Sequence, residues 1–336
     1  MLFGTSALDW SYAAVPSQAG KVVLITGGNT GLGRALAEDF LNPECLPLEN
    51  QPSKVIITCR DTSKVADAIA QSSILRPHHG DASSGKLEVL KMDLADQAQV
   101  RAAVAELKGR VSKLDCLVLN AGCYGENGLT TKDGLEVCIG VCHFGHFLLT
   151  KLVWDLLLKA DGHARVVPVS SSGHGLVKIK SGQEMLDDLN WRTRPYDPYE
   201  AYSEAKLANI LFAKELARRA GSSGKSAKEL EGGSRTAVTV VTLSPGFAAT
   251  GLLRNQGCFM PWLLARLGEA PETMSRNSMH AATDLSLSSG CYLTPKRMTL
   301  YGPPIVADTT KMACDEELAK KLWAETESVL GEQFEP

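Results

Sequence analysis

The sequence lacks several features that mark particular classes of protein. Its N-terminal stretch, residues 1–20, has no run of about 18 apolar residues, the length that a transmembrane helix needs. The same stretch has no basic segment followed by a continuous apolar core, so a signal peptide is not expected. The net charge of −3 gives no indication of a nucleic-acid-binding surface. We therefore expect an intracellular protein, cytoplasmic or membrane-associated, that binds no nucleic acid.

A disulfide framework is also missing. The nine cysteines are odd in number and scattered, and they include no C-x-x-C pair, which favours reduced thiols. Cys138 and Cys142 lie close to His143 and His146, in and just before the stretch "GVCHFGHFLLTKL". On a helix, however, His143 points about 100° away from Cys142, so the four side chains do not share one face. We expect no metal site there.

What the sequence does contain is a regular alternation of short apolar runs and helical patterns. The apolar runs are 21–26, 54–59, 86–92, 114–120, 164–170 and 237–244, with a weaker strand near 298–301. The helical patterns are 31–41, 63–72, 97–109, 132–159, 201–220 and 271–288. Strands that are apolar on both faces and alternate with helices predict an α/β fold, a Rossmann-type doubly wound parallel sheet covered on both sides.

The alternation is continuous enough to indicate one domain. Three polar or Gly/Ser/Pro-rich inserts, 42–53, 76–86 and 221–235, are typical of surface loops and not of domain linkers. We expect a flexible leader over 1–20 and a single domain over 21–336.

The first predicted strand runs into the glycine-rich turn "TGGNTGLG", Thr26 to Gly33. Glycines allow a tight turn and let the backbone approach a pyrophosphate, which the N-terminus of the following helix attracts. Such a turn alone is a weak signal, but its place at the start of an alternating α/β pattern strengthens it. The turn predicts a dinucleotide site with the contact residues Gly27, Asn29, Thr30, Gly31, Leu32 and Gly33.

Two arginines favour NADP(H) over NAD(H) as the cofactor. Arg60 follows the second strand, where a carboxylate would accept the 2′-hydroxyl of NAD and a cation would instead pair with a 2′-phosphate. Arg34, directly after the last glycine, adds a second cation. A purely solvated Arg60 stays open as the alternative. The ends of the third and fourth strands supply the remaining expected cofactor contacts, Asp93, Leu94, Asn120, Ala121 and Gly122.

The segment "AYSEAK" places Tyr202 and Lys206 four residues apart, on one face of a predicted helix. Tyrosine alone is a poor acid or base at neutral pH because its pKa is about 10. A neighbouring ammonium favours the phenolate and lowers that pKa, which makes the pair suitable for proton transfer. The pair follows "VSSSGH", where a serine hydroxyl can polarise a carbonyl oxygen.

Together these motifs resemble the short-chain dehydrogenase/reductase family, roughly from Lys21 to Thr250. The shared order is T-G-x-x-x-G-x-G, N-A-G, a serine after the fifth strand, Y-x-x-x-K and then P-G. The stretches "LITGGNTGLGRALA", "TKDGLEVCIGVCHFGHFLLTKL" and "AYSEAKLANILFAKELARR" are similar to the retinol-dehydrogenase-like branch, which is close to the light-dependent protochlorophyllide reductases. The latter have a cysteine where this chain has Asn209, so a protochlorophyllide reductase is not expected.

The resemblance implies a role for each motif residue. Tyr202 would be the general acid/base, and Lys206 would lower its pKa and hold the nicotinamide ribose. Ser171 would orient the substrate oxygen, with Ser170 and Ser172 as alternatives. The residues that would bracket the nicotinamide amide are Pro245, Gly246 and Thr250. The implied reaction moves a hydride between the nicotinamide of NADP(H) and a carbonyl or alcohol.

One position departs from the family pattern. Relatives usually read V-N-H-x-G-H-F, with an asparagine that anchors a water linked to the catalytic lysine, and this chain has Cys142 there. A thiol is a weak donor and a weak acceptor. Cys142 is tolerated if the relay runs through its main-chain carbonyl, and otherwise proton supply to Tyr202 is impaired. The second case leaves a catalytically weak NADP(H)-binding sensor or scaffold as an alternative function.

The segment 247–271 is rich in Leu, Met, Phe and Trp, and the resemblance implies a lid over an apolar substrate. A retinoid-, aldehyde- or ketone-like substrate is expected, with sterol or porphyrin reduction as an alternative. Plain packing of that segment, or its contact with a membrane surface, stays open. Trp191, Tyr196 and Tyr199 are candidates for the entrance, and a homodimer also stays open.

Overall fold

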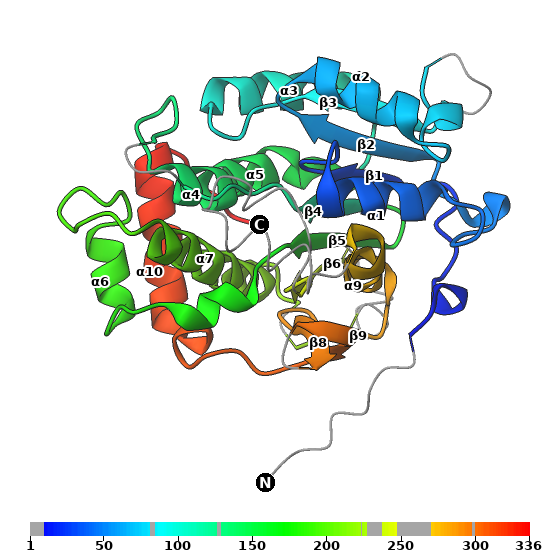
Figure 1. Cartoon of the computed structure of the whole chain (residues 1–336). Helices are drawn as coiled ribbons and strands as arrows, with labels where there is room; N and C mark the ends of the chain where they lie inside the picture. The colour runs from blue at the N-terminus through cyan, green and yellow to red at the C-terminus, as the bar shows by residue number, and fades with distance from the viewer. Residues whose placement is uncertain are drawn as a thin grey trace, which may run out of the picture.

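The computed structural model describes residues 10–80, 85–125, 129–222, 224–226, 237–246, 270–297 and 300–336. Its centre is a six-stranded sheet in the order β3-β2-β1-β4-β5-β6, in which every pairing is parallel (Figure 1). The strands are β1 (Val22–Ile25), β2 (Lys54–Cys59), β3 (Leu87–Lys91), β4 (Cys116–Leu119), β5 (His163–Pro168) and β6 (Ala237–Val240). The chain moves outward from β1 to β3, returns to the centre and moves outward again from β4 to β6. This order confirms the doubly wound sheet predicted from the sequence.

Helices cover both faces of the sheet (Figure 1). One face carries α3 (Gln97–Arg110), α5 (Gly145–Leu157), α7 (Pro198–Arg219) and α10 (Glu316–Leu330). The other carries α1 (Gly31–Leu41), α2 (Thr62–Gln71) and α9 (Pro271–Thr283). Successive residues of β1 explain this layering: Val22 and Leu24 lie in the first core, and Val23 and Ile25 lie in the second. The two cores share one sheet, so they form a single domain.

The strand predicted over 237–244 is two strands. β6 ends at Val240, and β7 (Thr242–Leu243) belongs to a second, three-stranded sheet. In that sheet β7 pairs in parallel with β8 (Tyr292–Arg297), and β8 pairs antiparallel with β9 (Tyr301–Val306). Of the weaker strand expected near 298–301, residues 298 and 299 lie outside the described part of the chain, and β9 begins at Tyr301. β8 was not predicted, because Pro295 inside "YLTPKR" weakens its strand pattern.

The long helix predicted over 132–159 begins later and is not uniform. It consists of α4 (Val137–Ile139), a π-helical turn over Gly140–Phe144, and α5. Glu136 sets the start, because its carboxylate accepts hydrogen bonds from the N–H groups of Cys138 and Ile139, both at 2.9 Å. The helix predicted over 271–288 ends early as well, at Thr283.

The end of the predicted leader contacts the domain. Trp10 stacks on His280 with ring centroids 5.2 Å apart, and the Tyr12 hydroxyl donates to Asp39 at 2.9 Å. Val15 packs against the second core. Residues 1–9 lie outside the part of the chain that the structure describes, as do residues 247–269, which make up most of the predicted lid.

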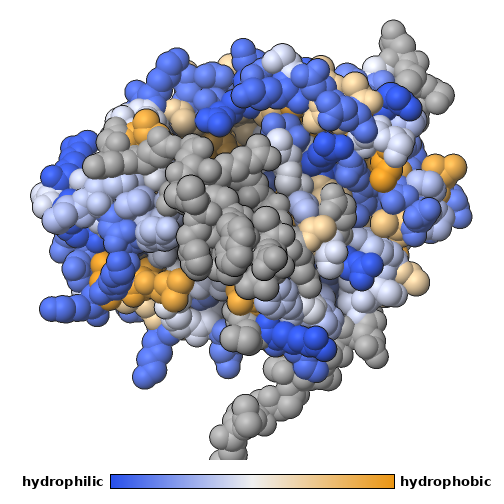
Figure 2. Space-filling model, in the orientation of Figure 1, coloured by the Kyte–Doolittle hydropathy of each residue, from blue (hydrophilic) through white to orange (hydrophobic). Residues whose placement is uncertain are grey.

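One described helical stretch, Val137–Leu157, is long and apolar enough to cross a membrane by length and composition. However, 78% of its apolar window is buried inside the protein. Figure 2 shows that the described surface on one face of the molecule is mainly hydrophilic, with apolar residues limited to a few patches. The apolar character of this helix is therefore explained by its position in the first core.

Trp323 of α10 anchors the C-terminal helix to that core. It is 1% exposed, and its ring contacts those of Phe147, Phe212 and Phe334. We expect Trp323→Ala to lower the free energy of unfolding by about 3–5 kcal/mol in urea denaturation, because it removes a buried ring and leaves a cavity. Val329→Ala, at a 38% exposed position of the same helix, is the control and should change it by less than about 0.5 kcal/mol. Equal losses in both variants would contradict this account.

Candidate functional site

The residues singled out in the sequence gather at the carboxyl ends of the parallel strands. Thr26 follows β1, Arg60 follows β2, Asn120 follows β4, and Ser171 lies just beyond β5. In doubly wound sheets this edge binds ligands, at the point where the chain reverses its direction of travel between β1 and β4.

The glycine-rich turn joins β1 to α1 and is fastened to β4. Gly27 and Gly31 have φ angles of +66° and +54°, in the left-handed region that favours glycine. At Gly33 a Cβ would lie only 2.5 Å from Asn120 Nδ2, so a larger residue does not fit. Asn120 Nδ2 donates to the Thr26 carbonyl at 2.8 Å. The backbone of the turn is therefore held in one shape by its neighbour.

The N-terminus of α1 differs from those of α2 and α7 in its capping. Its N-cap residue, Thr30, makes no side-chain hydrogen bond to the first turn. By contrast, Asp61 caps α2 and Asp197 caps α7 through their carboxylates. The first N–H groups of α1 are not satisfied by a cap, which fits the binding of a pyrophosphate at this end.

Two cations and an aspartate flank the turn. Arg60 is exposed directly after β2. Arg34 is partly committed elsewhere, because its Nε lies 3.0 Å from Oε1 of Glu38. After β3, Asp93 accepts the N–H of Ala95 at 2.9 Å, and Leu94 is buried. Arg60 is thus the better placed of the two predicted cations to meet a phosphate.

Ser171, Tyr202 and Lys206 come together beyond the end of β5. A Cβ on Gly173 would lie 3.4 Å from Ser171 Oγ and 3.5 Å from Tyr202 Cε1, so these two side chains lie side by side. Lys206 Nζ lies 5.6 Å from the centre of the Tyr202 ring and donates to the Val169 carbonyl at 3.1 Å.

The three consecutive serines have different surroundings. Ser170 is buried, and its hydroxyl donates to the Lys206 carbonyl at 2.7 Å. The N–H of Ser172 donates to Ser244 Oγ at 3.0 Å. Ser171 is the serine whose side chain faces Tyr202.

Burial governs the proton affinities in this group. It raises the pKa of Tyr202 above its ordinary value, while the Lys206 charge and a hydrogen bond with Ser171 act in the opposite direction. Lys206 thus acts in the expected direction, but burial outweighs it, because the phenolate loses more solvation than the ammonium restores. Burial alone would lower the pKa of Lys206, but the negative charges that Cys142 and Tyr202 carry once they ionise at high pH more than compensate and raise it. At neutral pH the pair is a phenol beside an ammonium.

Cys142 lies in the π-helical turn and faces the same space. A Cβ on Gly122 would meet Lys206 Nζ at 3.4 Å and Cys142 Sγ at 3.5 Å. A hydrogen bond with Cys123, together with burial, raises the pKa of the Cys142 thiol well above its ordinary value. The group next to Lys206 is therefore a neutral thiol.

His146 holds the main chain of the turn. Its Nδ1 lies 3.0 Å from the Cys142 carbonyl oxygen, and its Nε2 lies 2.9 Å from Thr26 Oγ1. Because a carbonyl only accepts, we assign the proton to Nδ1, which leaves Nε2 to accept from Thr26. His146 therefore links the turn to the end of β1.

His143 points to a different part of the protein. Its Nε2 lies 2.7 Å from Thr326 Oγ1 in α10, and that hydroxyl donates to the Leu322 carbonyl at 2.6 Å. His143 Nε2 is therefore the donor, so the two histidines hold opposite tautomers. Each has its own structural partner.

Of the residues predicted to bracket the nicotinamide amide, the structure describes only Pro245 and Gly246. Gly246 has a φ of +101°, and the Pro245 carbonyl accepts from Asn277 Nδ2 at 3.1 Å. Thr250 lies outside the described residues. Of the three entrance candidates, Tyr199 packs edge-to-face against Tyr124, whereas Tyr196 and Trp191 pack against one another.

Sequence reasoning missed two residues at the site. Tyr124 has its ring centroid 5.6 Å from that of Tyr202, and its place two residues after N-A-G was the only signal. Asn209 donates through Nδ2 to the Val169 carbonyl at 3.0 Å, the same oxygen that Lys206 contacts. It was noticed only as a departure from a cysteine pattern.

Comparisons with known proteins identify the family and support the fold. Residues 21–183 match a family model described as short chain dehydrogenase. The chain is 34% identical over 334 residues to retinol dehydrogenase 13 of Homo sapiens, covering 95% of this chain and 88% of that protein. It is 35% identical over 329 residues to retinol dehydrogenase 14 of Homo sapiens, covering 93% and 87%. Among solved structures, an uncharacterised protein from Mycobacterium paratuberculosis matches with a TM-score of 0.72 at 29% identity, covering 98% of this chain and 99% of that one.

The buried His143 predicts a pH-dependent stability. Burial lowers its pKa from 6.5 to about 3, so below pH 6.5 the unfolded chain binds a proton that the folded chain does not. Relative to a His143→Gln variant, the wild type should lose about 1.4 kcal/mol of unfolding free energy per pH unit below pH 6.5. Urea denaturation from pH 8 to pH 5 measures this, and the difference between the two proteins should be constant above pH 7. A difference that stays constant down to pH 5 would refute it.

Proposed function

The chain belongs to the short-chain dehydrogenase/reductase family, and on that premise we propose that it transfers a hydride between NADP(H) and the carbonyl or alcohol of an apolar substrate. Membership confirms the resemblance drawn from the sequence motifs and makes the protein an oxidoreductase of that family. Two of its relatives are named retinol dehydrogenases, so retinoid-, aldehyde- or ketone-like molecules are the proposed substrates.

The meeting of Ser171, Tyr202 and Lys206 beyond β5 is the observation that carries the proposal. Because burial raises the pKa of Tyr202, its hydroxyl is protonated and suited to donate to the oxygen of a carbonyl under reduction. Ser171 Oγ, beside it, is suited to hold the same oxygen. The Lys206 ammonium then stabilises the phenolate that is left behind.

The residues around the first turn fit a phosphorylated dinucleotide. The uncapped N-terminus of α1 offers N–H donors to a pyrophosphate, and Gly33 lets the turn pack closely against Asn120 and the Gly27 carbonyl. The exposed Arg60 offers a cation where the adenosine ribose is expected, which supports NADP(H) over NAD(H). When bound, the nicotinamide ring supplies or accepts the hydride.

A catalytically weak NADP(H)-binding sensor or scaffold is the competing function, and Cys142 in place of an asparagine is its support. The π-helical turn nevertheless forms with a cysteine, and His146 holds its carbonyl. This geometry favours the enzyme, because the helix keeps its distortion without the amide side chain. Sterol or porphyrin reduction would be a variant of the same enzyme with a different substrate.

The proposal is tested by NADPH oxidation with retinal, decanal and a ketosteroid as substrates. We expect turnover with at least one of them, and we expect Tyr202→Phe to lower kcat by at least about 100-fold because the proton donor is lost. NADPH affinity, measured by fluorescence titration, should stay within about twofold, since the ring remains. Retained turnover in the variant would exclude Tyr202 as the acid. Micromolar NADPH binding by the wild type without turnover of any carbonyl would favour the sensor.

Cofactor choice is tested at Arg60. Arg60→Ala removes the proposed partner of the 2′-phosphate, and a hydrogen bond to a charged group contributes about 1.5–3 kcal/mol, so the KM for NADPH should rise about 10- to 100-fold. The KM for NADH, which lacks that phosphate, is the internal control and should change by less than about threefold. An equal rise for both cofactors would show that Arg60 does not select between them.

A further inference from the structure

One loop lies beside the proposed site and contacts two helical segments that carry residues of that site. The loop runs from Asp188 to Tyr196 and is called the brace below. It contacts α7, which carries Tyr202 and Lys206, and it also contacts the start of α4, which leads directly into the π-helical turn with Cys142.

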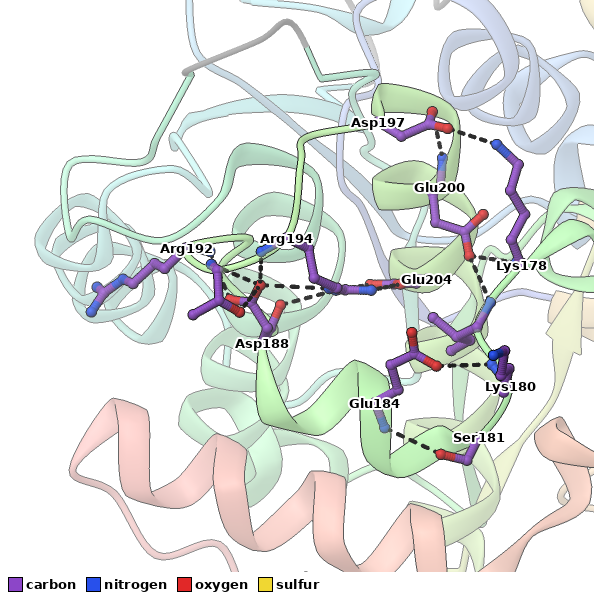
Figure 3. A network of polar contacts seen from close by, with 12 residues as sticks. Lys178, Lys180, Ser181, Glu184, Asp188, Arg192, Arg194, Asp197, Glu200 and Glu204 are labelled. Atoms are coloured by element: carbon purple, nitrogen blue, oxygen red, sulfur yellow. Dashed lines mark hydrogen bonds and ion pairs between the residues drawn. The ribbon is translucent and has the colours of Figure 1, made fainter.

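The contact with α7 is a buried ion pair. Arg194 Nη1 and Nη2 lie 2.6 and 2.9 Å from the two carboxylate oxygens of Glu204, and Nη2 also donates to the Asp188 carbonyl at 3.0 Å (Figure 3). The Arg194 and Glu204 side chains are 18% and 3% exposed. A bidentate pair of this kind fixes distance and orientation together, and a buried carboxylate that loses such a partner is left uncompensated.

The brace has a defined internal shape. The Asp188 carboxylate accepts from the N–H groups of Arg192, Thr193 and Arg194 at 2.6, 3.0 and 2.9 Å (Figure 3). Trp191 has a φ of +53°, unusual for a bulky side chain, and its ring lies under the Arg194 guanidinium at 4.0 Å. The loop is therefore folded around the Asp188 carboxylate, and this fixed shape can hold α4 and α7 at a constant distance from one another.

The contact with α4 is made at its capping residue. Glu136, which caps α4, accepts from the Tyr196 hydroxyl at 2.9 Å, and its own N–H donates to Asn190 Oδ1 at 3.1 Å. Gly125 makes room for this, because a Cβ there would collide with the Tyr196 hydroxyl. The carboxylate that starts the helix is thus also the one that the brace holds.

We propose that the brace is a positioning device, in which Tyr196 and Arg194 set the spacing between the π-helical turn with Cys142 and the face of α7 with Tyr202 and Lys206. This inference rests on the proposed function for its effect on turnover. Neither Arg194 nor Tyr196 contacts the reacting atoms in this role. Arg194 acts through Glu204, and Tyr196 acts through Glu136.

Tyr196→Phe tests the proposal with the smallest change, since it removes one hydroxyl and keeps the ring. We expect kcat for NADPH-dependent reduction to fall about five- to twentyfold, while the KM for NADPH stays within about twofold. Glu204→Gln keeps hydrogen-bonding capacity toward Arg194 but loses the charge. It should lower kcat by less than Tyr196→Phe does. Arg192→Gln is the matched control, because its side chain is exposed and only its N–H takes part in the brace, and it should leave kcat unchanged.

A second measurement does not depend on activity. Iodoacetamide labelling followed by mass spectrometry reports how often each buried thiol is exposed by local opening. In Tyr196→Phe, labelling of Cys138 and Cys142, which are 0% and 1% exposed, should speed up at least fivefold. Cys59 and Cys116, which are 3% and 4% exposed on β2 and β4, should keep their rates.

The outcomes separate the two proposals. Equal acceleration of all four thiols would mean that Tyr196 supports only global stability, and no acceleration with unchanged kcat would mean that the brace positions nothing. Either result overturns the inference. If the wild type shows no turnover, the proposed function fails, and the labelling pattern alone then decides for or against the brace.

Discussion

The site depends on how the buried ammonium of Lys206 is held. Lys206 Nζ and Asn209 Nδ2 donate to the same carbonyl of Val169, at 3.1 and 3.0 Å, and Ser170 Oγ donates back to the Lys206 carbonyl at 2.7 Å. An unpaired charge in this position would cost several kcal/mol, on the order of the desolvation penalty of one ion. These bonds therefore fix the register of α7 against the end of β5. That register brings the hydroxyl of Ser171 beside the proposed acid.

The second constraint is the distortion of the neighbouring helix, the π-helical turn that contains Cys142. Gly140 and Gly145 flank the π-helical turn, and both are tightly packed: a Cβ on Gly140 would collide with Thr131, and one on Gly145 would lie 2.6 Å from the Leu94 carbonyl. His146 then holds the Cys142 carbonyl. Close approach at both ends and one imidazole thus hold the turn in this chain, which has a thiol at position 142.

The alternation of strands and helices was predictable because it follows from the local periodicity of apolar residues. β2 and α1 match their predicted bounds. The errors occur where a distant or side-chain contact overrides the pattern. The helical pattern from residue 132 continues through the true start at Val137, which the carboxylate of Glu136 determines. The motif residues of the site could be found because each motif lies within a few consecutive residues of the sequence. Two other features depend on how separate segments of the chain pack against one another. They are the pairing of Arg194 with Glu204 and the choice of Ser171 over Ser170, and neither can be predicted from the local sequence.

The buried ionisable groups act on stability in opposite directions. Burial raises the pKa of Glu204 above its usual value, against the effect of Arg194, so just above pH 4.5 the folded chain holds a proton that the unfolded chain releases. Stability from this group therefore falls as pH rises just above 4.5. His143 and His146, whose pKa values burial lowers from 6.5 to about 3, make stability rise between about pH 3 and pH 6.5. The two effects oppose one another just above pH 4.5, and below pH 4.5 Glu204 no longer opposes the histidines. Protonation of the buried imidazoles then destabilises the helix that carries Cys142 and its contact with α10. Because Tyr202 and Lys206 are already protonated at neutral pH, acid should act on the site through these histidines and not through the Tyr/Lys pair.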